Sequence, residues 1–144
     1  MKDTEIMKNH EHILLIEDDD VDVMTVRRSL KEVGASNPLD LMSDGEQALR
    51  HLRNPASVRP GLILLDLNMP RMNGVEFLTA LRADPALRSI PVVVLTTSQE
   101  ESDRINSFSH SVSGYMIKPV DYPQFVKTMR IIRDYWTSSE SSPV

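Results

Sequence analysis

The chain lacks cysteine and lacks an excess of basic residues. Its 144 residues include no cysteine, which excludes disulfide bonds, thiolate metal sites and a cysteine nucleophile. The 16 Lys and Arg face 21 Asp and Glu, giving a formal net charge of -5. A direct nucleic-acid role is therefore not expected, since such proteins carry a basic surface. A chain of this length is expected to form one domain.

Long hydrophobic runs are also missing. No apolar stretch approaches the roughly 20 residues that span a bilayer. The N-terminal segment MKDTEIMKNHEH is polar and lacks the apolar stretch of a signal peptide. We therefore expect a soluble, cytoplasmic protein without membrane contact. Residues 1–11 and 137–144 lack periodicity and are expected to be flexible tails around a domain at 12–136.

Short apolar runs alternate with amphipathic segments through that domain. The runs HILLIE, LDLM, GLILLD, IPVVVLT and GYMI predict five strands, of which the three most apolar should be central. Helices are expected after them, near 20–33, 45–54, 74–84, 99–110 and 123–136. Five strand–helix pairs with short connections predict an α/β fold, a doubly wound parallel sheet with helices on both faces.

Polar residues follow the strands at one edge of this sheet, where ligands bind in such folds. They are Glu17 and Asp18, Asp66 and Asn68, Thr96 and Thr97, and Lys118. Two carboxylates about 4–5 Å apart repel by roughly 3–4 kcal/mol at an effective dielectric constant of about 20. The three acids therefore predict a bound cation, and oxygen-only ligands favour Mg2+.

This set of groups is equipped to transfer a phosphoryl group. A metal ion and Lys118 can neutralise charge on the transferring oxygens, and Thr96 can donate a hydrogen bond to one of them. The nucleophile would be a carboxylate, and the product an aspartyl phosphate. The central, most apolar strand holds its last residue most rigidly, so Asp66 is the expected nucleophile.

The segments ILLIED, LILLDLNMPRMNGVEFL, VVVLTTS and GYMIKPVDYPQF resemble the motifs of response-regulator receiver domains in two-component signalling. They follow that family's order and spacing over roughly residues 12–136. LDLNMPRMNG and KPVDYPQFVKTMRIIRDYW are similar to the single-domain receivers paired with bacterial phytochromes and related sensor histidine kinases. The resemblance implies a flavodoxin-like (βα)5 receiver fold. It also implies a stand-alone regulator, or a phosphorelay component, that a sensor histidine kinase phosphorylates.

The family pattern assigns the metal site residue by residue. Asp66 is the phosphoacceptor and, with Asp18, a direct Mg2+ ligand, while Glu17 acts through water. Asn68 offers its backbone carbonyl to the metal. With Thr97, which is larger than the small residue usual in the family, Asn68 also borders the path of the phosphoryl group.

The pattern also assigns the conformational switch. Thr96 is the switch hydroxyl, and Tyr115 is the aromatic residue that swings inward when the threonine moves. Lys118 binds the phosphoryl group. Its bond to Pro119 is expected to be cis, a form that is accessible at low cost only before proline.

The last predicted helix carries apolar residues on two faces. Phe125, Met129, Ile132 and Trp136 form a core stripe, and Ile131 and Tyr135 lie off it. These two are either scattered surface residues or part of a homodimer face. In related receivers that face combines the segments at about 99–110, 114–117 and 123–136.

Two other functions remain as alternatives. A phosphohydrolase of the haloacid-dehalogenase type would need a second aspartate two residues after its nucleophile, where this chain has Asn68. A phosphorylation-independent interaction module could keep the same fold. We expect no enzymatic turnover beyond self-catalysed phosphotransfer and slow autodephosphorylation.

The first acidic run divides under this interpretation, because Asp19, Asp20 and Asp22 are expected to cap and begin the next helix. Asp18→Asn should abolish Mg2+-dependent phosphorylation, since it removes a metal ligand. Asp20→Asn should leave phosphorylation nearly unchanged. Intact-mass analysis after incubation with acetyl phosphate measures both, and equal behaviour of the two variants would contradict the division.

Overall fold

The computed structural model describes residues 11–67, 72–96, 114–117 and 121–141, and only the backbone at 96, 114–117 and 135–141. The strands are β1 (Ile13–Ile16), β2 (Leu39–Met42), β3 (Leu62–Asp66), β4 (Val92–Thr96) and β5 (Gly114–Ile117). The helices are α2 (Asp20–Glu32), α3 (Gly45–Arg53), α4 (Gly74–Ala83) and α6 (Tyr122–Ser141).

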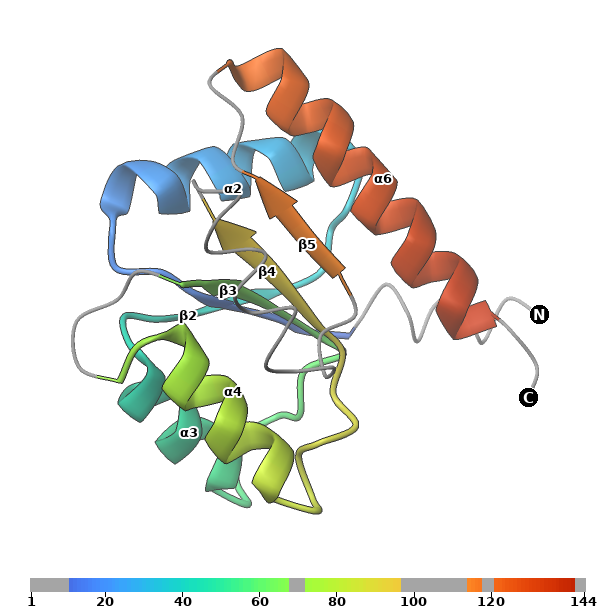
Figure 1. Cartoon of the computed structure of the whole chain (residues 1–144). Coiled ribbons are helices and arrows are strands. Elements are labelled where there is room, and N and C mark those ends of the chain that lie inside the picture. The colour runs from blue at the N-terminus through green and yellow to red at the C-terminus, as the bar shows by residue number, and fades with distance from the viewer. Residues whose placement is uncertain (1–10, 68–71, 97–113, 118–120, 142–144) are drawn as a thin grey trace.

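The five strands form one parallel sheet in the order β2-β1-β3-β4-β5. Helices α2 and α6 cover one face of the sheet, and α3 and α4 cover the other (Figure 1). The predicted doubly wound α/β fold is confirmed. The three most apolar strands, β1, β3 and β4, occupy the centre, as predicted. The strand order reverses between β1 and β3. The carboxyl ends of these two strands therefore form the topological switch point, where ligands bind in such folds.

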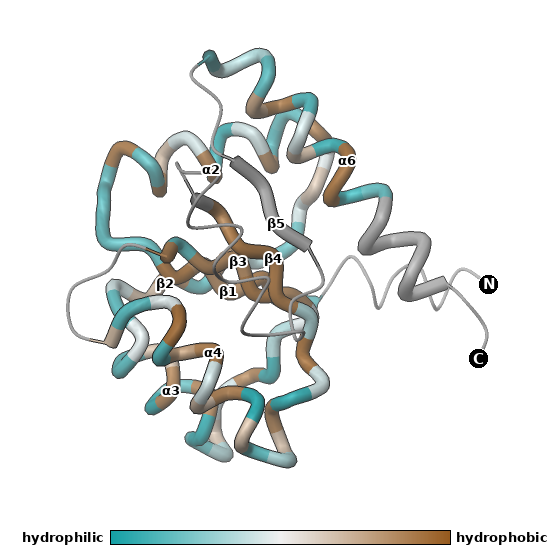
Figure 2. The backbone as a smooth tube through the Cα atoms, viewed as in Figure 1, coloured by the Kyte–Doolittle hydropathy of each residue, from teal (hydrophilic) through white to brown (hydrophobic). Residues whose placement is uncertain are grey.

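Two hydrophobic layers enclose the sheet, whose central strands appear in Figure 2 as the brown centre of the molecule. Successive side chains of a strand point to opposite faces. The layer beneath α2 and α6 takes from the central strands Ile13, Leu15, Leu62, Leu64, Val93 and Leu95. The layer against α3 and α4 takes Leu14, Ile16, Ile63, Leu65, Val92 and Val94. The apolar runs are continuous because both of their faces are buried.

Helix α2 has well-formed signals at both ends. The Asp19 side chain caps it, accepting hydrogen bonds from the backbone nitrogens of Val21 and Asp22 at 2.8 and 3.1 Å. At the other end Gly34 has a φ of 79°, a conformation that costs glycine little. The backbone nitrogens of Gly34 and Ala35 donate to the carbonyls of Lys31 and Leu30, the Schellman pattern. The predicted stop at Gly34 is confirmed.

Three polar contacts join α2 and its C-cap residue to α6. The Arg133 guanidinium donates to the Val33 carbonyl at the C-terminus of α2. The Arg28 guanidinium lies 4.2 Å from the centre of the Tyr122 ring, and the Tyr122 hydroxyl donates to Glu32 at 3.0 Å. Desolvation and then the hydrogen bond to Glu32 raise the pKa of Tyr122. These links fix how the first and last described helices cross.

The structure differs from the predicted boundaries at both ends. The Glu11 carbonyl accepts a hydrogen bond from the Asn37 side chain at 2.8 Å, so Glu11 belongs to the folded domain. Helix α6 continues to Ser141, and the predicted end at Trp136 is wrong. The polar residues after Trp136 are weak helix formers but not breakers, and the first breaker is Pro143. Residues 1–10 and the helix expected at 99–110 lie outside the described residues.

Arg133→Ala should lower the free energy of unfolding by about 1–2 kcal/mol, because it removes a charge-assisted hydrogen bond at a helix C-terminus. Urea denaturation measures the change. Arg130, exposed on the same helix, supplies the matched control. Arg130→Ala should change the stability by less than about 0.5 kcal/mol. An equal loss in both variants would show that the link to Val33 contributes nothing.

Candidate functional site

The sheet register brings two acidic residues level at the carboxyl ends of adjacent strands. Ile16 of β1 is paired with Leu65 of β3, so the residues that follow them, Glu17 and Asp66, share one level of the sheet. The backbone nitrogen of Glu17 also donates to the Met42 carbonyl of β2 at 3.0 Å, which extends the ladder by one residue. The backbone therefore fixes both acids at the central edge, as predicted.

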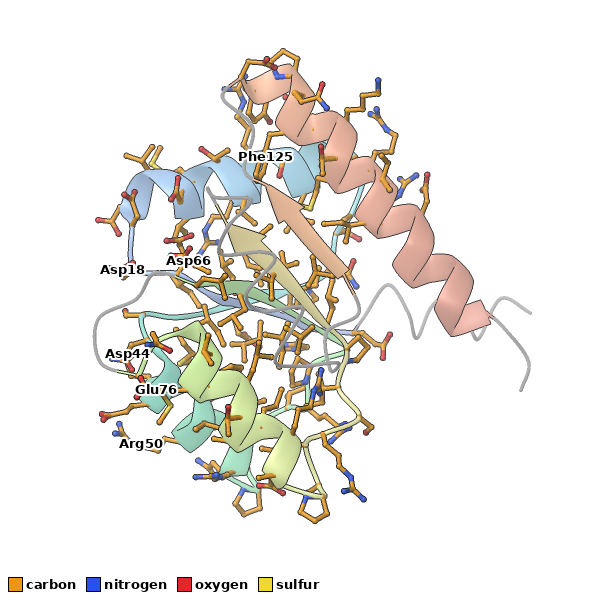
Figure 3. The ribbon with its side chains drawn as sticks, viewed as in Figure 1. Asp18, Asp44, Arg50, Asp66, Glu76 and Phe125 are labelled. Carbon is orange, nitrogen blue, oxygen red and sulfur yellow. The ribbon has the colours of Figure 1, made fainter. Side chains whose placement is uncertain are left out.

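Asp18 completes a cluster of three carboxylates with these two residues. One oxygen from each of Glu17, Asp18 and Asp66 lies within 4.8 Å of the others. Glu17 and Asp66 are only 2% and 5% exposed, whereas Asp18 is exposed. In Figure 3, Asp18 and Asp66 lie beside each other near the start of α2. The predicted grouping of these acids is therefore present in the structure.

This cluster fits a small divalent cation. In an octahedral site with metal–oxygen distances of about 2.1 Å, two ligand oxygens are at most about 4.2 Å apart. Oxygens already within 4.8 Å of one another need only a small side-chain adjustment to reach that geometry. The ligands are all hard oxygen donors, and Asp18 stands at the solvent side, where a cation that keeps several waters can enter.

The acids that follow Asp18 serve α2, as predicted. The Asp19 side chain caps the helix, and Asp20 and Asp22 occupy its first turn. The backbone nitrogen of Asp19 donates to a Glu17 carboxylate oxygen at 3.3 Å. Asp19 therefore marks the boundary within the acidic run, because its side chain caps the N-terminus of α2 and its amide orients the buried Glu17.

The loop after Asp66 returns closely to the strand it leaves. The backbone nitrogen of Gly74, the first residue of α4, donates to the Leu67 carbonyl at 3.2 Å. A Cβ atom on Gly74 would lie 2.9 Å from the Leu67 Cα and 3.4 Å from the Asp66 carbonyl oxygen. Only glycine permits this approach. Periodicity places a helix here but gives no sign of the contact, although a glycine opening a helix is the signal that could have shown it.

Several predicted site residues lie wholly or partly outside the described residues. Asn68, Thr97, Lys118 and Pro119 lie outside them, so their roles, including the cis bond, stay predictions. For Thr96 and Tyr115 the backbone alone is described: Thr96 ends β4, and Tyr115 is paired with Val94 of that strand.

The predicted homodimer face is represented by one described side chain. Ile131 is 62% exposed on α6, while Phe125, Met129 and Ile132 of the predicted stripe are buried. The side chains of Trp136 and Tyr135 are not among those described. The division of the helix into two faces is confirmed for these four residues, and the homodimer stays a prediction.

Within the part of the chain that the structure describes, no helix is long and apolar enough to cross a bilayer.

A family model described as the response regulator receiver domain matches residues 13–130. Among curated proteins, the response regulator Rcp1 of Synechocystis is 37% identical over 135 residues, which cover 91% of this chain and 92% of Rcp1. The match therefore spans nearly the full length of both proteins.

Solved structures of similar proteins share the fold. The phosphorylated cyanobacterial phytochrome response regulator RcpA is 34% identical with a TM-score of 0.80, covering 90% of this chain and 96% of its own. The Mn2+-bound form of Rcp1 is 38% identical with a TM-score of 0.77, covering 88% of this chain and 94% of its own. The bacteriophytochrome response regulator RtBRR is 42% identical with a TM-score of 0.74, covering 83% of this chain and 76% of its own.

Repulsion within the cluster predicts opposite effects of one substitution with and without metal. In metal-free buffer, Asp18→Asn should raise the thermal midpoint by a few degrees, about 2–4 °C for each kcal/mol of repulsion relieved. Added Mg2+ should then stabilise the wild type and leave the variant unchanged, since binding to the native state alone raises stability. Differential scanning calorimetry measures both effects. Asp134→Asn, exposed on α6, is the control.

Proposed function

Because the chain belongs to the response-regulator receiver family, we propose that it is a phosphorylated signalling protein in which Asp66 accepts a phosphoryl group from a sensor histidine kinase. The observation that carries this proposal is the cluster of Glu17, Asp18 and Asp66 at the carboxyl end of the central strands. The grouping of these three acids supports the roles of phosphoacceptor and metal ligands that the family resemblance implies for them.

Asp66 is well placed to act as the nucleophile. It ends the central strand β3 and is 5% exposed, so its carboxylate is held in position before a donor arrives. One carboxylate oxygen attacks phosphorus as the bond from phosphorus to the imidazole nitrogen of a phosphohistidine breaks. The electron pair of that bond leaves with the nitrogen, and the product is an aspartyl phosphate.

The three acids together would hold the cation that this reaction requires. Asp18 and Asp66 would ligate Mg2+ directly, Glu17 would act through water, and Asn68 would contribute its backbone carbonyl. When bound, Mg2+ neutralises charge on the acids and on the transferring oxygens. The Asp19 amide, by its hydrogen bond to Glu17, keeps that carboxylate directed toward the cluster. Lys118 and Thr96 would complete the set of groups on the phosphoryl oxygens.

The output of the phosphorylated form is proposed to be a change in partner binding. Thr96 would engage the phosphoryl group and Tyr115 would follow it inward, changing the face that β5 and α6 form. Ile131, which is 62% exposed on α6, supports a homodimer through that face, to which Tyr135 would also contribute. The names of RcpA and RtBRR support a phytochrome-type kinase as the upstream partner. We also propose that the protein does not turn over external substrates as an enzyme.

The test is incubation with acetyl phosphate and Mg2+, followed by intact-mass analysis under conditions that preserve acyl phosphates. The wild type should gain the mass of one phosphoryl group, and the gain should disappear in Asp66→Asn or when EDTA is added. Asp40→Asn is the matched control, because Asp40 also lies on a strand, β2, but its carboxylate pairs with His12 at 2.7 Å and is not part of the cluster. A mass gain that persists in Asp66→Asn would exclude Asp66 as the acceptor.

The upstream partner is tested separately, by transfer from purified autophosphorylated histidine kinases. A phytochrome-type kinase should transfer its phosphoryl group faster than unrelated kinases. If the wild type accepts no phosphoryl group from any donor, and beryllofluoride with Mg2+ shifts no amide signal near Asp66, the chain is a phosphorylation-independent interaction module instead.

A further inference from the structure

Gly45 and Met72 meet at a contact that joins α3 to the loop after Asp66. Gly45 is the first residue of α3, and Met72 precedes Asn73, the residue that caps α4. A Cβ atom on Gly45 would lie 2.8 Å from the Met72 carbonyl oxygen, 3.0 Å from its Cγ and 3.1 Å from its Sδ. The backbone and the side chain of Met72 therefore both occupy space that any other residue at position 45 would fill.

Both partners are locally unfavourable choices. Glycine in a helix interior is less favourable than alanine by about 1 kcal/mol, and Gly45, as the first residue of α3, carries part of that cost. Met72 has a φ of 46°, and no other non-glycine residue in the described part of the chain has a positive φ. That region costs a residue with a side chain about 1–2 kcal/mol. Two such costs at one contact indicate a role beyond local stability, since departures from local rules concentrate at functional sites.

The contact has a direct route to Asp66. Met72 leads through Asn73 to Gly74, whose backbone nitrogen donates to the Leu67 carbonyl at 3.2 Å. Asn73 and Glu76 form a reciprocal capping box, with hydrogen bonds of 2.9 and 3.0 Å, that makes this turn rigid. Leu67 directly follows Asp66. A shift of Met72 is therefore passed to the residue adjoining the candidate phosphoacceptor.

Helix α3 gives the contact a firm base. Asp44 is 4% exposed, and its side chain accepts a hydrogen bond from the Gln47 backbone nitrogen at 2.9 Å. The Gln47 side chain accepts in turn from the Ser43 backbone nitrogen at 3.2 Å. The partly buried Met72 also packs against the hydrophobic layer of α3 and α4. The first turn of α3 is thus fixed, and Met72 rests on it.

We propose that Met72, seated on Gly45, is a positioning residue for phosphorylation of Asp66. It holds residues 72–74 against Leu67 and so sets where the Asp66 carboxylate stands relative to Glu17 and Asp18. This inference rests on the proposed function, because it concerns the same phosphoacceptor. It assigns a role to two residues that touch neither the metal site nor the phosphoryl group.

The main experiment compares two glycine substitutions in the full-length chain. Gly45→Ala should slow phosphorylation by acetyl phosphate about ten-fold or more, since a misplacement of about 1 Å can cost 10²-fold. It should also raise the Mg2+ concentration needed for half-maximal phosphorylation. Gly61→Ala is the matched control. Gly61 lies just before β3, at the opposite edge of the sheet, and its Cβ would lie 2.8 Å from the Glu11 carboxyl group. Its rate should stay within about two-fold of wild type.

A double-substitution cycle separates positioning from general destabilisation. Met72→Gly keeps the backbone conformation accessible and removes the thioether side chain, so it should also slow phosphorylation. Adding Gly45→Ala to Met72→Gly should then cause less than the additive loss, because the side-chain part of the contact is gone and glycine at position 72 lets the backbone carbonyl adjust. Additive losses, or equal slowing in Gly61→Ala, would overturn the proposal.

The position of the loop is measured independently of phosphorylation. Amide NMR signals of Leu67 and Gly74 should shift in Gly45→Ala and stay in place in Gly61→Ala, with no phosphoryl donor present. Unchanged signals in both variants would overturn the inference even if the wild type is phosphorylated. If the signals shift in Gly45→Ala but the wild type accepts no phosphoryl group, the contact is present and it is the proposed function that has failed.

Discussion

Repulsion among Glu17, Asp18 and Asp66 is the interaction on which this edge of the molecule depends. The parallel ladder leaves the chain no means of separating Glu17 from Asp66, because the residues before them are paired in register. With oxygens within 4.8 Å and an effective dielectric constant of about 20, a pair of full charges repels by about 3 kcal/mol or more. That is a large part of the roughly 5–15 kcal/mol by which a domain is stable. A positive charge at the centre would reverse the sign of this contribution, so the edge would be most stable with a cation bound.

The helix caps explain how so many polar side chains coexist at this edge. Asp19, Asp44, Asn73 and Asp121 each accept a hydrogen bond from the first turn of the helix that follows them. Each of those helices follows a strand, so four helix N-termini face the side of the sheet where the carboxylates gather. The caps satisfy amides at the helix N-termini, and none of these four capping residues belongs to the cluster of Glu17, Asp18 and Asp66.

Sequence reasoning succeeded where a local pattern determines the structure. The continuous apolar runs predicted buried central strands, and the order of residues after β1 separated Asp18 from the capping Asp19. It did not predict the contact of Gly45 with Met72 or the link from Arg133 to Val33. These join residues far apart in the chain, and no periodicity marks them. The end of α6 was misjudged because weak helix formers after Trp136 resemble a tail, although a helix that is already formed continues through them at small cost.

The separation of the core into two layers has a consequence for how this protein can change over evolutionary time. The layer under α2 and α6 and the layer against α3 and α4 share no residue, because the sheet lies between them. Substitutions in distant, non-contacting parts of a fold have nearly additive effects on stability. Substitutions on the outer face of α6 are therefore expected to leave the packing of Met72 on Gly45, on the other side of the sheet, nearly unchanged. The sheet thus separates the surface of α6, where substitutions have mostly local effects, from the packing of α3 and α4 on its other face.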